Sequence, residues 1–213
     1  FFDSKTILQE IVQANFKEVT SYHLIGEEGP DHNKIFRVAV HIGEDEYGVG
    51  EGRTKKAAEQ EAAYISILKL HEKGCLLFGI CGGFQMLGKQ VSDPDQTEGG
   101  GSLRGLGLLD METIFQPQKH QQQVQGTIAE PSGIFAPLAG SAITGYEIHM
   151  GRSIAGSHAI PFTRRADGTL NGYCNEAGTV SGTYLHGFFD TAETTAALLQ
   201  LLRKQTGRAE ELS

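Results

Sequence analysis

GICGGFQMLG, residues 79–88, is the stretch that decides the fold of the second part of this sequence. The apolar run at residues 76–78 predicts a β-strand before it, and the residues after Cys81 predict a helix. A strand, a tight turn with a nucleophile at its tip and a helix form the nucleophile elbow G-x-C-x-G. Gly79 and Gly83 are the small neighbours that such a turn requires, and we expect the helix N-terminus to favour the Cys81 thiolate. A buried structural cysteine beside a glycine turn is the alternative.

A candidate base for this cysteine lies far downstream, in TVSGTYLHGFFD, residues 179–190. This stretch predicts a β-strand that ends in an exposed histidine, His186, at a glycine turn. In an open α/β sheet, functional residues gather at the carboxyl ends of the strands, so we expect His186 beside Cys81. There the imidazole can take the thiol proton and later protonate a leaving amine.

Residues 79–88 resemble the nucleophile motif of the class I glutamine amidotransferases. Three further stretches resemble the cobyric acid synthase branch of that family in their order and spacing: RGLGLL at 104–109, GYEIHMGR at 145–152 and GTYLHGFFD at 182–190. The resemblance runs from about residue 74 to about residue 206. It implies a partial three-layer α/β amidotransferase domain whose substrate is glutamine.

The resemblance also implies roles for individual residues. Cys81 attacks the side-chain amide of glutamine and releases ammonia, with His186 as general base and acid. The backbone N–H of Gly82 supplies one oxyanion-hole donor. Gln85 is expected on the first turn of the elbow helix, in a structural role.

The residue that orients the histidine stays open at this point. Many class I amidotransferases carry a glutamate two residues beyond the histidine, where this sequence has Phe188. Asp190 and Glu147 are two alternative carboxylates for this position.

The first third of the chain predicts a different, α+β fold. Residues 3–13 begin with a capping pattern and carry apolar residues at positions 7, 8, 11 and 12, which is helical spacing. Three β segments follow at residues 21–25, 34–41 and 46–52, and Thr54 is the predicted N-cap of a long helix. The predicted order is therefore α-β-β-β-α.

This order resembles a double-stranded RNA-binding domain, in particular the C-terminal domain of bacterial ribonuclease III, over residues 3 to about 71. The loop GPDH at residues 29–32 and the Lys55-Lys56 pair carry the likeness. The resemblance implies that Gln9, Glu10 and His32 contact successive minor grooves of double-stranded RNA. Lys55 and Lys56 would meet phosphates.

Charge is the main observation against RNA binding. Residues 1–72 hold eight Lys and Arg against thirteen Asp and Glu, and the whole chain has a net charge of −8. An acidic domain lacks the diffuse attraction of a typical nucleic-acid binder. Arg53 stands beside the two lysines, so we expect weak and strongly salt-dependent binding to duplex RNA.

Composition sets further expectations. No apolar run approaches the roughly 20 residues that span a bilayer, and no secretory signal is recognised at the start of the sequence. Three cysteines without a C-x-x-C pair favour a reducing, cytoplasmic setting. No zinc spacing, P-loop or dinucleotide fingerprint is present, so we expect neither a metal nor a cofactor.

The sequence thus predicts two domains, residues 1–72 and 73–213, joined with almost no linker. The strands that precede the nucleophile strand in such amidotransferases, and the second oxyanion donor they carry, have no counterpart here. We therefore expect impaired activity and self-association through an exposed sheet edge. Three functions stay open: a glutamine amidotransferase fused to an RNA-binding domain, an RNA-binding module without catalysis, and an artificial fusion with neither activity intact.

Overall fold

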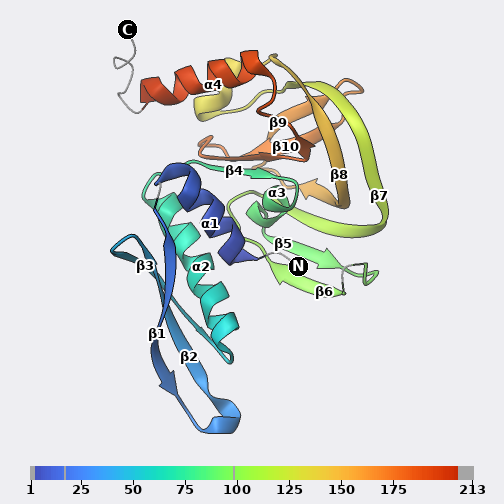
Figure 1. Cartoon of the computed structure of the whole chain (residues 1–213). Coiled ribbons are helices and arrows are strands. Elements are labelled where there is room, and N and C mark those ends of the chain that lie inside the picture. Colours follow the sequence, from blue (N-terminus) through green and yellow to red (C-terminus); the bar gives the residue numbers. More distant parts are fainter. Residues whose placement is uncertain (1–2, 17, 98, 206–213) are drawn as a thin grey trace. The chain divides into compact units, whose positions relative to one another are not determined.

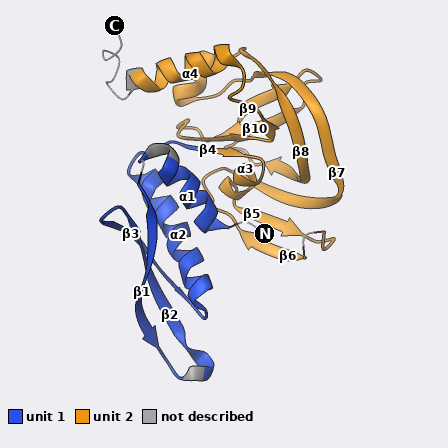
Figure 2. Ribbon diagram, in the orientation of Figure 1, with its two compact units in different colours: residues 1–77 blue, residues 78–213 orange. Residues whose placement is uncertain are grey.

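The computed structural model describes residues 3–16, 18–97 and 99–205. It divides the chain into two compact units, residues 1–77 and residues 78–213, which Figure 2 distinguishes by colour. Each unit has its own sheet and is described by itself.

Unit 1 has the predicted order of elements (Figure 1). They are α1 (Ser4–Asn15), β1 (Thr20–Glu28), the short 3₁₀ helix η1 (Asp31–Asn33), β2 (Ile35–Ile42), β3 (Asp45–Gly52) and α2 (Lys55–Glu72). The strands pair antiparallel in the order β1-β2-β3. The side chain of Thr54 accepts a hydrogen bond from the Ala57 N–H and so caps α2, as the sequence predicts.

Small residues let α2 pack directly on β3. A Cβ atom on Gly50 would lie 2.2 Å from the Ala62 nitrogen, and one on Gly48 would lie 2.7 Å from the Ala62 carbonyl oxygen. Both distances are shorter than van der Waals contact, so the helix can approach the sheet only where the strand has no side chain. Around this contact lies an apolar core that includes Leu8, Val38, Val40, Ile67 and Leu70.

Unit 2 is built on a nine-stranded sheet and contains two α-helices among its described residues. Its elements are β4 (Leu77–Ile80), α3 (Gly82–Leu87), β5 (Gln90–Asp93), β6 (Gly101–Arg104), β7 (Met111–Ile128), the 3₁₀ helix η2 (Gly133–Leu138), β8 (Ala142–Ala155), β9 (Ile160–Arg165), β10 (Leu170–Cys174), β11 (Val180–Thr183), β12 (Leu185–His186) and α4 (Ala192–Gln205). The main path of the sheet is β12-β8-β7-β9-β10-β11-β4, and β5 and β6 extend from β7.

The strand directions differ from those expected of an open α/β sheet. The pairs β7–β8, β7–β9, β9–β10, β10–β11 and β8–β12 are antiparallel, whereas β5 and β7 are parallel. The pairs β7–β8, β9–β10 and β10–β11 join strands that are consecutive in the chain, and such hairpins are antiparallel. The sequence pattern around Cys81 indicates one strand and one helix and carries no information on these later hairpins.

Helices lie on both faces of this sheet. In Figure 1, α4 lies above strands β9 and β10, and α3 lies below them. Leu198 of α4 belongs to a buried cluster with Phe162, Leu185 and Phe188, while Phe84 of α3 is fully buried near β11. The sheet order brings the end of β11 beside the end of β4, and this positions the candidate active site.

Candidate functional sites

Cys81 lies at the tip of a strand-to-helix turn between β4 and α3. Its backbone has φ 51° and ψ −110°, a conformation that non-glycine residues rarely adopt. A hydrogen bond of 2.9 Å from its N–H to the carbonyl oxygen of Thr183 holds the turn against β11. Such strain in a non-glycine residue is typical of functional positions.

Only one of the two glycines that flank Cys81 stands where a larger residue would collide with its neighbours. A Cβ atom on Gly79 would lie 2.6 Å from the backbone nitrogen of Phe84, whereas one on Gly83 would meet no heavy atom within 4 Å. The expectation that both must be small is therefore wrong for Gly83. The elbow helix passes over Gly79 and turns Gly83 toward open space.

The surroundings of Cys81 favour the neutral thiol over the thiolate. Its Sγ donates a hydrogen bond of 3.3 Å to the carbonyl oxygen of Ile148 on β8. Burial raises the pKa of the thiol, and the backbone N–H of Gly82, directed at the sulfur, opposes this shift only in part. The expected effect of the helix N-terminus is therefore present at the Gly82 N–H, but burial of Cys81 outweighs it.

His186 is the last residue of β12. Two backbone contacts of nearby residues connect its surroundings to those of Cys81. His186 lies three residues after Thr183, which binds the Cys81 backbone, and it pairs with Tyr146, two residues before Ile148. Its Nε2 atom is buried and has no hydrogen-bond partner among the described residues. The structure therefore brings the two predicted residues to one region, with no hydrogen bond between thiol and imidazole in the described part of the chain.

Neither carboxylate proposed to orient the histidine contacts it in the described structure. Glu147 is paired with Leu185, so its side chain lies on the face of the sheet opposite to that of His186. Asp190 is exposed and forms a turn in which its N–H donates to the carbonyl of Gly187 at 2.9 Å. The strand pairing, which the sequence does not reveal, is what turns Glu147 away.

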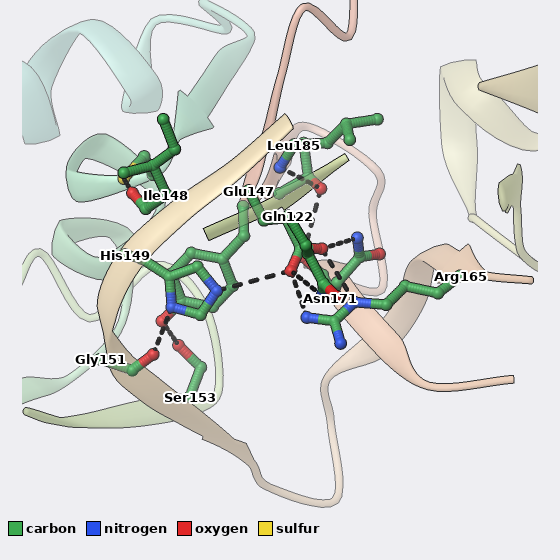
Figure 3. Close-up of polar contacts among 12 residues, drawn as sticks. Gln122, Glu147, Ile148, His149, Gly151, Ser153, Arg165, Asn171 and Leu185 are labelled. Atoms are coloured by element: carbon green, nitrogen blue, oxygen red, sulfur yellow. Dashed lines mark hydrogen bonds and ion pairs between the residues drawn. The ribbon is translucent and has the colours of Figure 1, made fainter. Parts of the chain in front are cut away.

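Glu147 is instead the centre of a buried polar network, drawn in Figure 3. Its side chain has no exposed surface and accepts two hydrogen bonds from the guanidinium of Arg165 and one from Asn171 Nδ2. Gln122 Nε2 adds a longer contact of 3.4 Å, and His149 Nε2 lies 3.6 Å away. Burial alone would raise the pKa of Glu147, but the interactions with His149, Arg165 and Asn171 outweigh it and lower the pKa to about 2.

A second set of polar contacts connects β8 with α3. The hydroxyl of Tyr184 lies 2.7 Å from Ser153 Oγ and accepts a hydrogen bond of 3.3 Å from Gln85 Nε2. Gln85 is buried, in agreement with its predicted structural role. Tyr184 and Ser153 are not among the residues predicted from the sequence. Each carries a hydroxyl that must find a partner when buried, but nothing in the sequence names that partner.

The residues predicted to bind RNA are all exposed in unit 1. Gln9 and Glu10 lie on α1, and His32 lies in η1 between β1 and β2. A hollow of about 330 Å³ is lined by His32, Asn33, Lys34, Phe36 and Arg53. The hollow thus joins the β1–β2 loop to the end of β3.

Three cations beside the N-terminus of α2 have no acidic partner among the described residues. Among the residues that the structure describes, Arg53, Lys55 and Lys56 form no ion pair, and Lys55 Nζ lies 5.9 Å from the centre of the Phe36 ring. Three other cations of the unit are paired: Lys5 with Glu59, Lys34 with Glu27 and Arg37 with Glu51. Arg53, Lys55 and Lys56 therefore keep their positive charge unpaired at the N-terminus of α2, although the unit as a whole is acidic.

The described residues contain no group of three His, Cys, Asp or Glu side chains arranged to hold a metal ion. Within the same residues, no helix is both long and apolar enough to cross a membrane.

Comparison with known proteins identifies two families. Residues 49–194 match the CobB/CobQ-like glutamine amidotransferase domain, which is more than half of the chain. The chain belongs to this family. Residues 4–70 also match the double-stranded RNA binding motif. The two matches overlap at residues 49–70, which lie in unit 1 of the structure.

Curated relatives of this CobB/CobQ-like chain carry the name cobyric acid synthase. The protein of Dehalococcoides mccartyi is 41% identical over 158 residues, which cover 71% of this chain and 31% of the relative. That of Photorhabdus laumondii is 44% identical over 153 residues, covering 68% and 29%. The chain therefore spans about a third of the length of these relatives.

A solved glutamine amidotransferase from Thermotoga maritima aligns with 70% of this chain and 56% of its own, at 13% identity and a TM-score of 0.41.

Proposed function

We propose that unit 2 hydrolyses the side-chain amide of glutamine, with Cys81 as nucleophile and His186 as general base and acid. The proposal rests chiefly on the strained backbone of Cys81 at the strand-to-helix turn. The buried Nε2 of His186, which has no hydrogen-bond partner in the described part of the chain, supports it. An imidazole that lacks a partner is available to receive the thiol proton.

The reaction proceeds in two balanced steps. Cys81 transfers its thiol proton to His186, the thiolate attacks the amide carbon, and the C–N bond breaks as the imidazolium protonates the leaving ammonia. Water then adds to the glutamyl thioester, giving up one proton to His186, and the C–S bond breaks to yield glutamate and the thiol. The Gly82 N–H stabilises the oxyanion in both steps.

The thiol must leave its present hydrogen bond before it reacts. Because Sγ now donates to the Ile148 carbonyl, the first event after substrate binds is a turn of the thiol toward the imidazole. The product ammonia would serve cobyric acid synthesis in cobalamin formation, a role proposed from the names of the relatives.

Glutaminase assays of the whole chain test this proposal. Cys81→Ala should abolish glutamate release, and His186→Ala should lower kcat by orders of magnitude. Cys75→Ala is the matched control, because Cys75 is a second partly exposed cysteine that lies outside the elbow. Undiminished activity of Cys81→Ala would refute the assignment.

For unit 1 we propose binding of double-stranded RNA through the surface formed by α1, η1 and the N-terminus of α2. The cluster of Arg53, Lys55 and Lys56 supports it, because these cations have no ion-pair partner among the described residues. Unpaired cations release counterions from phosphates without first breaking an existing salt bridge.

Fluorescence anisotropy with duplex RNA and duplex DNA of equal length tests this second proposal. Lys55→Ala with Lys56→Ala should weaken RNA binding and reduce the slope of log affinity against log salt by about 2. Lys69→Ala with Lys73→Ala removes equal charge from the other end of α2 and should have a much smaller effect. His32→Ala should reduce the preference for RNA, and equal affinity of the unchanged chain for both duplexes would refute the proposal.

The two assays also test the third candidate function, an artificial fusion. A folded chain that neither releases glutamate nor binds duplex RNA would be a fusion with neither activity intact.

A further inference from the structure

Tyr184 occupies a central position behind the candidate active site. It is only 4% exposed and lies between the last residue of β11 and the first of β12. Its ring stacks on His149 of β8, with centroids 3.7 Å apart and planes 17° apart. On another side it meets Phe84 of α3 edge-on at 5.1 Å.

The hydroxyl of Tyr184 joins the same two elements by hydrogen bonds. It accepts from Gln85 Nε2 on α3 at 3.3 Å and lies 2.7 Å from Ser153 Oγ on β8. Ser153 Oγ is in turn 2.8 Å from Thr113 Oγ1 on β7. A single buried hydroxyl thus connects an element of the elbow to two strands of the sheet, and burial raises its pKa so that it remains a neutral phenol.

Tyr184 and the residues that contact it each lie within a few residues, in the sequence, of one group of the candidate active site. Gln85 lies four residues after Cys81, and the Gln85 N–H also donates to the Cys81 carbonyl at 3.0 Å. His149 follows Ile148, whose carbonyl accepts the thiol hydrogen bond. His186 lies two residues after Tyr184 itself. A shift of this ring relative to α3 or β8 therefore changes the separation of sulfur, carbonyl and imidazole.

We propose that Tyr184 is a positioning residue, which sets the relative placement of Cys81, the Ile148 carbonyl and His186 through its contacts with α3 and β8. This inference rests on the proposed glutaminase function of the site. Tyr184 itself takes no part in bond making, because its hydroxyl is already engaged by Gln85 and Ser153.

Tyr184→Phe removes the hydroxyl and keeps the ring. A displacement of about 1 Å in a reacting group can lower the rate by about 10²-fold, so we expect kcat for glutamine to fall by about 10- to 100-fold with KM within about twofold. Tyr173→Phe is the matched control, since the Tyr173 ring also stacks near Phe84, at 6.3 Å, and its hydroxyl forms no hydrogen bond to another described residue. It should leave kcat within about twofold.

A second measurement does not depend on turnover. Iodoacetamide alkylation of Cys81, followed by mass spectrometry of its peptide, gives the pH dependence of thiol reactivity. In Tyr184→Phe the thiol should be held less well against the Ile148 carbonyl, so the midpoint should move down toward the ordinary thiol range and the rate at pH 7 should rise at least threefold. Tyr173→Phe should retain the profile of the unchanged chain.

The outcomes separate positioning from stability alone. A Tyr184→Phe protein with a lowered Tm but unchanged kcat and alkylation profile would overturn the proposal. If that variant does not fold, Ser153→Ala, which removes one of the two hydroxyl contacts, must show the same direction of change, and an unchanged profile would overturn it. If the unchanged chain lacks glutaminase activity, the proposed function fails, and the alkylation profiles still decide whether Tyr184 positions the thiol.

Discussion

Replacing Glu147 by Gln should make unit 2 much less stable and remove a specific part of its acid sensitivity. Glu147 has no exposed surface, and its carboxylate is held by Arg165 and Asn171. The substitution keeps the shape of the side chain and removes its charge. Arg165, whose side chain is 21% exposed, then loses its ionic partner.

The lowered pKa of Glu147 sets the size of the effect. Glu147 has an ordinary value of 4.5 and a folded value of about 2, which corresponds to about 3 kcal/mol of stability. Because the folded pKa is lowered, this contribution is fully present above pH 4.5 and is lost as the pH falls toward 2. Removing one member of a buried pair costs about 3–5 kcal/mol, and the partial exposure of Arg165 places the expected loss near the lower end.

Urea unfolding of unit 2, measured between pH 7 and pH 2, is the assay. The free energy of unfolding of Glu147→Gln should be about 3 kcal/mol below that of the unchanged chain at pH 7, and the difference should shrink as the pH falls toward 2. Glu130→Gln is the matched control. Glu130 Oε2 lies 2.8 Å from the guanidinium of Arg164, the residue before Arg165, but the Glu130 side chain is 66% exposed. It should cost less than about 1 kcal/mol, and an equal effect of the two substitutions would refute the reasoning.

Three glycine-to-alanine substitutions test the packing. Gly79→Ala should destabilise unit 2 by at least about 1–3 kcal/mol because its Cβ would meet the backbone of Phe84, whereas Gly83→Ala should be close to neutral; thermal unfolding compares them, and equal losses would contradict the account of the elbow. Gly50→Ala should destabilise unit 1 by a similar or larger amount, since its Cβ would lie 2.2 Å from the backbone of α2, and duplex RNA binding should fall with the folded fraction; a fully folded variant in circular dichroism would show that α2 can move away from β3.

Local patterns in the sequence determine the elements of this protein. The helix at residues 4–15, the three strands and the capped α2 of unit 1 follow from apolar spacing, alternation and the Thr54 cap, all of which act over a few residues. The elbow around Cys81 is visible for the same reason, because a glycine-flanked cysteine between a strand and a helix is a local arrangement.

Only the tertiary structure decides which distant groups meet. Gln85 and Tyr184 are 99 residues apart, and their contact depends on the order of the strands in the sheet. The pairing of Leu185 with Glu147 places the carboxylate on the face away from His186, and a shift of one residue in register would reverse that. Burial of Cys81, a product of packing, likewise raises the pKa of its thiol more than the Gly82 N–H at the start of α3 lowers it, and the sequence alone does not reveal that burial.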